Sequence, residues 1–185
     1  SGSSGPPVNG GTSTISSSTL SVWDGSSSNA WNTANNWTPS GVPTTTQDCR
    51  IGAALNVCRL SVTGSCLNGT LQSGGTLDFN STTNELRLYG AADVATGFTF
   101  SNATAGPGVF AMRGASNQSL KMRTTFPGAL LIANTGAGGS NIVSVDEDST
   151  FSGNATLTSG VLKVVAGKTL TITGNVTVQT GAELW

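Results

Sequence analysis

Glycine recurs at every seventh position through residues 151–185, and this spacing limits what the segment can fold into. The five positions are Gly153, Gly160, Gly167, Gly174 and Gly181. Most residues between them alternate apolar with polar, the pattern of short β-strands with one buried face. Glycine at each corner permits the tight bends that β-branched residues resist. Three strands with their corners span roughly 21 residues, within the range of a solenoid repeat.

The chain is therefore expected to be an all-β protein, a single-domain parallel β-solenoid (β-helix) with its body at residues 52–185. Parallel crossovers are overwhelmingly right-handed, so a right-handed coil is expected, with about 21 residues per coil in the C-terminal part. The side chains expected to point into the core there are Leu162, Val164, Leu170, Ile172, Val176 and Val178. Earlier strands, less regularly spaced, are expected near residues 57–62, 67–71, 76–79, 85–89, 97–100, 108–113 and 129–134.

Composition supports strands and excludes several partners. Only 9% of the 185 residues are charged, too few for the exposed faces of long helices, and the net charge is −1. A nearly neutral chain lacks the excess of basic residues that attracts nucleic acid or an anionic membrane. No apolar run approaches the roughly 20 residues of a spanning helix, so membrane insertion is not expected. The neutral surface and clustered cysteines favour a mature secreted protein at the cell surface.

Residues 1–22 begin as a Gly/Ser/Pro segment and become a Thr/Ser-rich run with β propensity. A segment so poor in apolar residues does not fold on its own. Two interpretations are open: the extension lies along its own domain, or it docks on a neighbouring subunit as an added strand.

Residues 23–51 hold three tryptophans, Trp23, Trp31 and Trp37, spaced by Asn, Ser and Gly without a helix or strand period. One interpretation is a cap that covers the apolar core and strand edges of the first coil. The alternative is a platform on which the rings stack against sugars.

This stretch resembles the unit that opens many large secreted bacterial β-helix proteins, autotransporter-like proteins and adhesins among them. The matching positions are Trp23, Gly25, Trp31, Asn36, Trp37, Pro43, Asp48 and Ile51. The resemblance implies an extracellular β-helix and no particular reaction. Such proteins are usually far longer than this chain.

Three cysteines, Cys49, Cys58 and Cys66, lie within eighteen residues. Zinc is not expected, because three thiolates without histidine lack a fourth ligand. In an oxidising compartment one intrachain disulfide is expected among the three, with no pairing favoured by the sequence. The remaining thiol is either buried or used in an intersubunit link.

The sequence offers little support for a catalytic site. The chain has no histidine, so Ser-His-Asp and Cys-His sets are impossible. Asp78 and Arg87 could approach across adjacent strands, as a polysaccharide lyase or hydrolase would need. The acidic run at 146–148 is either a solvated corner or a calcium site. No enzyme activity, cofactor or metal is expected.

We therefore expect a non-enzymatic extracellular structural protein, a self-assembling subunit of a surface filament or adhesive fibre that stacks head to tail. The reason is that no polar capping segment follows the regular coils. An exposed strand edge has unpaired backbone groups to which another chain can hydrogen-bond. The expected contact residues are Ile15, Leu20, Val22, Trp23, Trp31, Trp37, Leu184 and Trp185. The alternatives are a module that binds surface glycans through its tryptophans and a fragment of a longer β-helix adhesin.

Overall fold

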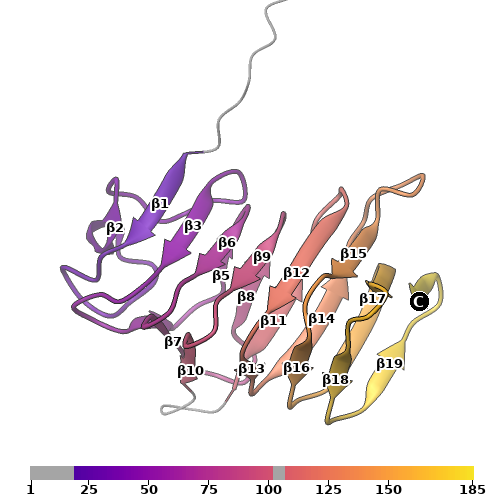
Figure 1. The fold of residues 1–185 in the computed structure, drawn as a ribbon. Helices are drawn as coiled ribbons and strands as arrows, with labels where there is room; N and C mark the ends of the chain where they lie inside the picture. Colours follow the sequence, from indigo (N-terminus) through magenta and orange to yellow (C-terminus); the bar gives the residue numbers. More distant parts are fainter. Residues whose placement is uncertain (1–18, 102–106) are drawn as a thin grey trace, which may run out of the picture.

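The computed structural model describes residues 19–101 and 107–185 (Figure 1). These residues form twenty β-strands and one short 3-10 turn, η1 (Ala34–Asn36), with no α-helix among them. The strands lie side by side along the molecule, so the winding chain advances from the β1 end to the β19 end (Figure 1). The predicted all-β parallel β-solenoid is confirmed, with about six turns of roughly 22 residues.

Three rows of strands form the walls of the coil, and successive turns add one strand to each. The first row is β1 (Leu20–Trp23), β3 (Asp48–Ile51), β6 (Gly69–Leu71), β9 (Ala92–Val94), β12 (Gln118–Met122), β15 (Ile142–Val145), the second half of β17 (Ala155–Val164) and β20 (Ala182–Leu184). The second row is β5 (Gly64–Cys66), β8 (Glu85–Leu88), β11 (Val109–Met112), β14 (Ala129–Ala133), the first half of β17 and β19 (Val176–Val178). The third row consists of two sheets, β4 (Cys58–Leu60), β7 (Thr76–Phe79) and β10 (Thr99–Ser101), then β13 (Thr125–Phe126), β16 (Ser149–Phe151) and β18 (Leu170–Ile172).

Strands of neighbouring turns pair in parallel, with the repeat length expected from the glycine spacing. In the C-terminal part, Ala155 lies beside Val176 and Gly160 beside Ala182, offsets of 21 and 22 residues. Among the described strands, the one antiparallel pair joins β1 to β2 (Trp37–Thr38). That exception lies at the N-terminal end of the stack.

The evenly spaced glycines serve two different purposes. Gly160 has φ +85° in the middle of β17, where the chain turns from the second row to the first. Gly153 and Gly174 instead allow coils to approach closely. A Cβ on Gly153 would lie 2.5 Å from the Gly128 carbonyl oxygen, and one on Gly174 would lie 2.8 Å from Gly153 backbone atoms. A side chain at either position would push adjacent turns apart.

Aromatic rings fill much of the interior. Phe126 is fully buried and lies edge-on to four other rings, with centroid distances between 4.8 and 5.8 Å. The partners are Phe79, Phe100, Phe110 and Phe151. Edge-to-face packing suits the ring quadrupoles, so these contacts join successive turns. In the next turn, the residue in register with Phe151 is Ile172.

The interior is closed along the body but not at its C-terminal end. Leu162 is buried as predicted, whereas Val164, Leu170 and Ile172 are only half-buried. The expectation of burial is wrong for Val176 and Val178, which are 48% and 45% exposed. The reason is physical: within the described residues, no further coil stacks on the last turn.

Candidate functional site: the two ends of the solenoid

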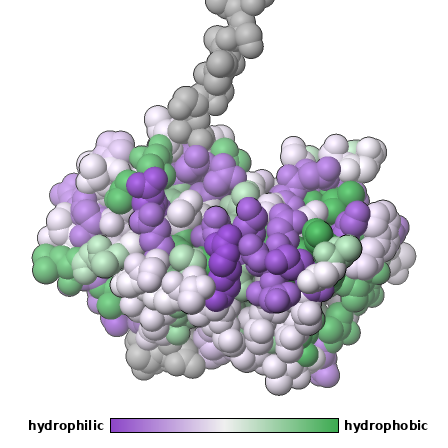
Figure 2. Space-filling model, viewed as in Figure 1, coloured by the Kyte–Doolittle hydropathy of each residue, from purple (hydrophilic) through white to green (hydrophobic). Residues whose placement is uncertain are grey.

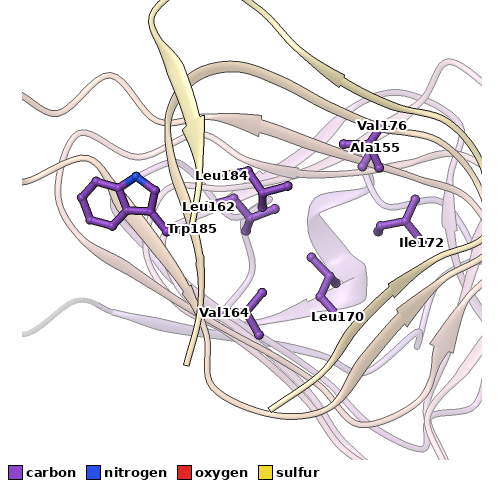
Figure 3. A pocket seen from close by; sticks show the side chains of 8 residues that line it. All are labelled: Ala155, Leu162, Val164, Leu170, Ile172, Val176, Leu184 and Trp185. Atoms are coloured by element: carbon purple, nitrogen blue, oxygen red, sulfur yellow. The ribbon is translucent and has the colours of Figure 1, made fainter. Parts of the chain in front are cut away.

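The last turn surrounds an open apolar cavity of about 360 Å³. Figure 3 shows its lining, which consists of seven aliphatic side chains and Trp185. Val164, Leu170, Ile172 and Val176 contribute to this lining, so these predicted core residues point inward although the coil leaves them uncovered. The cavity is the uncovered interior of the solenoid.

The rim of this cavity combines apolar side chains with ordered backbone. Leu184 and Trp185 are 49% and 59% exposed. The Trp185 backbone is nevertheless fixed, because its N–H donates to Leu162 and its carbonyl accepts from Val164, at 2.9 and 3.0 Å. The indole N–H donates to Glu183 at 2.7 Å. Among the described strands, β18, β19 and β20 each pair on one side only. Their other edges have backbone groups to which a further strand can hydrogen-bond.

The opposite end is capped by the three N-terminal tryptophans. Trp23, Trp31 and Trp37 are 2%, 1% and 1% exposed. Trp37 lies edge-on to both of the others, at 5.2 and 4.7 Å, and its indole N–H donates to the Trp31 carbonyl at 2.8 Å. These rings were expected to contact a neighbouring copy. That expectation is wrong, because the rings pack inside the coil. Rings so deeply buried also offer no stacking face to a sugar.

Asn36 ties the capping loop together. Its side-chain oxygen accepts from the backbone N–H groups of Ser27 and Ser28, at 2.9 and 2.7 Å. Its amide nitrogen donates to the Ala30 carbonyl and to the Ser28 hydroxyl. The buried amide is therefore fully used by the loop, and it holds the backbone around Trp31 in place.

β2 closes the first row at this end, because it lies antiparallel on β1 instead of continuing the parallel ladder. The hydroxyl of Thr38 in β2 donates to Asp24 at 2.5 Å, and the Ser26 backbone N–H donates to the same carboxylate. These hydrogen bonds, Thr38 first, hold the pKa of Asp24 below its usual range. The junction between β1 and β2 is thus fixed at its surface as well as in its core.

Leu20 and Val22 were expected to contact a neighbour, and both are half-buried in β1, which lies between β2 and β3. Ile15 and the rest of the expected donor segment up to residue 18 lie outside the described residues.

The N-terminal end carries exposed apolar residues that the sequence analysis missed. Leu55, Val57 and Val62 are 82%, 43% and 41% exposed. They flank β4 in the first complete turn, and Asn56 joins the loop before β4 to the cap. The Trp23 indole N–H donates to the Asn56 carbonyl at 2.9 Å, and the Asn56 amide donates to Gly25 at 2.6 Å.

The large apolar side chains that are exposed in the described part of the chain all lie near the two ends. Three belong to residues 55–62 and four to residues 176–185, and the turns between expose none. Figure 2 agrees: apolar surface gathers toward the β1–β2 side and the β18–β19 side, with mainly polar surface between. Exposed apolar patches commonly mark interaction surfaces.

The structure forms one disulfide among the three cysteines and leaves the third as a free thiol. Cys49 of β3 and Cys66 of β5 form a disulfide, with their Cα atoms 5.8 Å apart. This confirms the expected intrachain bond and identifies its partners. Cys58 is a buried free thiol, and burial raises its pKa well above the ordinary range. An intersubunit link through Cys58 is not compatible with this burial.

The candidate catalytic groups are dispersed in ion pairs. Asp78 pairs with Arg59 at 2.8 Å, whereas Arg87 pairs with Glu85 at 2.7 Å, so the suggested Asp78–Arg87 approach is not formed. Glu147 pairs with Lys168 at 2.8 Å, and this hydrogen bond holds the pKa of Glu147 below its usual range.

Among residues 19–101 and 107–185, no group of three or more Cys, Asp or Glu side chains is placed to hold a metal ion, the acidic run at 146–148 included. No helix in this described part is long and apolar enough to cross a membrane.

Comparison with known proteins gives one match. A family described as a domain of unknown function (DUF8693) matches residues 22–106, which comprise the tryptophan cap and the first turns. No curated protein and no solved structure matches the chain.

Proposed function

We propose that this protein is a non-enzymatic extracellular structural subunit whose copies associate through the ends of the solenoid to form a surface filament or adhesive fibre. The observation that carries the proposal is that, within residues 19–101 and 107–185, the exposed large apolar side chains are confined to 55–62 and 176–185. The ends are therefore the surfaces on which burial yields most free energy, at about 25 cal/mol per Å² of apolar area.

The two ends differ, which determines the kind of assembly. The N-terminal end is closed over its tryptophans and presents Leu55, Val57 and Val62. The C-terminal end is open and concave, and β18, β19 and β20 each have one edge that pairs with no other described strand. Contact between unlike surfaces is heterologous, and a heterologous contact that does not close into a ring produces a filament. A durable contact of this kind should bury more than about 1,000 Å² in total.

The remaining features support an extracellular structural role. The Cys49–Cys66 disulfide suits an oxidising compartment. Several charged side chains on the body are engaged in ion pairs such as Arg59–Asp78 and Lys168–Glu147, and the net charge of the chain is only −1. Because the rings of Trp23, Trp31 and Trp37 are buried, the sugar platform expected from them has no comparable observation in its favour.

The test is the oligomeric state of the purified protein, followed by light scattering across a concentration series. Wild-type protein is expected to grow in mass with concentration. Val176→Asp, which places a charge in the opening, is expected to remain monomeric. Thr156→Asp, on the outer side of β17, is the matched control and should assemble like the wild type. A wild-type chain that stays monomeric at high concentration would contradict the proposal and favour a longer chain that supplies the covering coil.

A further inference from the structure

We infer that a polar groove on the side of the solenoid binds a neutral oligosaccharide. The groove consists of two hollows, of about 530 and 140 Å³, which adjoin at Arg123 because this residue lines both. It lies at the corner between the first and the third row of strands, away from the two ends. Association through the ends leaves this corner accessible, so the inference goes beyond the proposed function.

The shape of the groove follows from the different lengths of successive corners. Two residues, 123–124, join β12 to β13, whereas four join β9 to β10 and three join β15 to β16. Because a shorter corner lies closer to the axis of the coil, the surface is recessed there between longer neighbours. The third row is also interrupted at this place, since β10 and β13 belong to separate sheets. From the turn of β6 to the turn of β15 the groove crosses three strand spacings, about 14 Å at roughly 4.8 Å each, which suits an extended ligand.

The side chains around the groove offer hydrogen bonds that the protein itself does not use. Six of them carry a hydroxyl or an amide group that bonds to no other residue within 19–101 and 107–185. Hydroxyl and amide groups both donate and accept hydrogen bonds, as the hydroxyl groups of a sugar do, so the two sets are complementary. The six residues are Thr70, Gln72, Ser73, Thr124, Thr125 and Thr150.

Arg123 lies between the two hollows with its guanidinium held in place. Its Nη1 donates to Asp93, its Nε lies 3.6 Å from the Glu147 carboxylate, and Lys168 pairs with that carboxylate at 2.8 Å. The Arg123 backbone N–H donates to the Val94 carbonyl at 3.0 Å. A guanidinium has five N–H groups, so these two side-chain contacts leave three for a ligand. Because the donor is ordered before binding, little entropy is lost when a ligand arrives.

The charges of the lining favour a neutral ligand. Two carboxylates, Asp93 and Asp148, oppose one guanidinium, Arg123, so the formal charge of the lining is −1. An anionic polymer would lie against both carboxylates without an excess of basic groups to compensate. Exposed large apolar side chains lie only near the two ends of the described chain, so the groove lacks the apolar anchors of a protein interface. A neutral oligosaccharide meets both conditions.

The first experiment screens the protein on an array of neutral and acidic oligosaccharides, at a concentration where the chain is monomeric. The strongest neutral binder is then titrated by isothermal calorimetry at low and at high salt. The wild type should bind it with an affinity that changes little with salt, because the ligand carries no charge to be screened. If no neutral oligosaccharide binds, or if binding is confined to acidic ones and weakens steeply with salt, the inference is wrong.

Variants then test whether the ligand occupies the groove. Arg123→Met keeps the aliphatic stem and removes the N–H groups, so binding should weaken roughly 10-fold to 100-fold, as for loss of a charged donor. Gln72→Ala in the larger hollow and Thr125→Ala in the smaller one should each weaken binding roughly 3-fold to 10-fold. Both of these side chains are exposed, so the variants should fold, which circular dichroism checks. Thr156→Ala, on the second row, is the control and should bind like the wild type.

Two outcomes separate this inference from the proposed function. Val176→Asp, which is expected to prevent association of the ends, should still bind the oligosaccharide as tightly as the wild type. A wild-type chain that binds the ligand but never assembles would contradict the proposed function alone. Binding that is unchanged in Arg123→Met, Gln72→Ala and Thr125→Ala would place the ligand elsewhere and overturn the inference.

Discussion

Removing the ring of Trp31 tests the cap most directly, because the chain offers a matched control in Trp185. Trp31 is 1% exposed and Trp185 is 59% exposed. A buried tryptophan removes about 200 Å² from water, which at about 25 cal/mol per Å² is worth roughly 5 kcal/mol. The edge-on contact with Trp37 at 4.7 Å contributes about 0.5–1.5 kcal/mol more. Alanine retains part of the apolar area, so Trp31→Ala should cost about 4–5 kcal/mol.

The assay is urea unfolding at low concentration, where the chain is monomeric, followed by circular dichroism and tryptophan fluorescence. For a domain of this size, the expected loss also lowers the melting temperature by roughly 10–18 °C. Trp185→Ala should change the free energy of unfolding by less than about 1 kcal/mol, since its ring is exposed. Equal effects of the two substitutions, or a loss below about 1 kcal/mol for Trp31→Ala, would refute the assignment of Trp31 to the cap's core.

Three further predictions concern the disulfide, an ion pair and the core. Replacing both Cys49 and Cys66 by serine should lower the free energy of unfolding by about 3 kcal/mol, measured in urea, as for a loop of similar length; an unchanged value would contradict the bond. The pKa of Glu147 is lowered in the fold, so its pairing adds stability that is fully present above the carboxyl's unfolded pKa and is lost as the pH falls through the lower folded pKa; the stability difference between wild type and Lys168→Met should therefore shrink progressively below about pH 4. A difference that does not shrink as the pH falls would contradict this pairing. Leu162→Ala should cost about 2–5 kcal/mol by thermal unfolding, because Leu162 is buried beneath the last turn; a negligible cost would indicate that the last turns are not packed.

The sequence predicted the fold class because its signal is local. Glycine spacing and short apolar alternation are visible without tertiary information, and the offset from Ala155 to Val176 follows from them. Several strands of the middle turns were missed, β12 (Gln118–Met122) among them. Its residues include Gln118, a polar side chain that is buried because its amide bonds to Leu88, Gly90 and Gly114. A buried polar residue interrupts the alternation on which the prediction depends.

The site was predicted less well, because it depends on which side chains other elements cover. The three tryptophans were expected both to cap the first coil and to contact a neighbouring copy, but the loop held by Asn36 folds them inward. Leu55 was not singled out, since a lone leucine in a loop has no pattern to mark it. Its significance comes from a fact of tertiary structure, namely that Asn56 fixes the loop to the cap with Leu55 facing solvent. Leu184 and Trp185 were expected to contact a neighbouring copy; both are exposed, and the contact stays a prediction.

Electron microscopy of the wild-type protein at high concentration tests head-to-tail association most directly. The described residues of one copy contribute nine strands along the first row, from β2 and β1 to β20, so stacked copies should repeat about every 40 Å at roughly 4.8 Å per strand. The account predicts unbranched filaments with this axial repeat, all subunits oriented alike. Single particles of one copy at every concentration, or paired copies joined through their C-terminal ends, would contradict it.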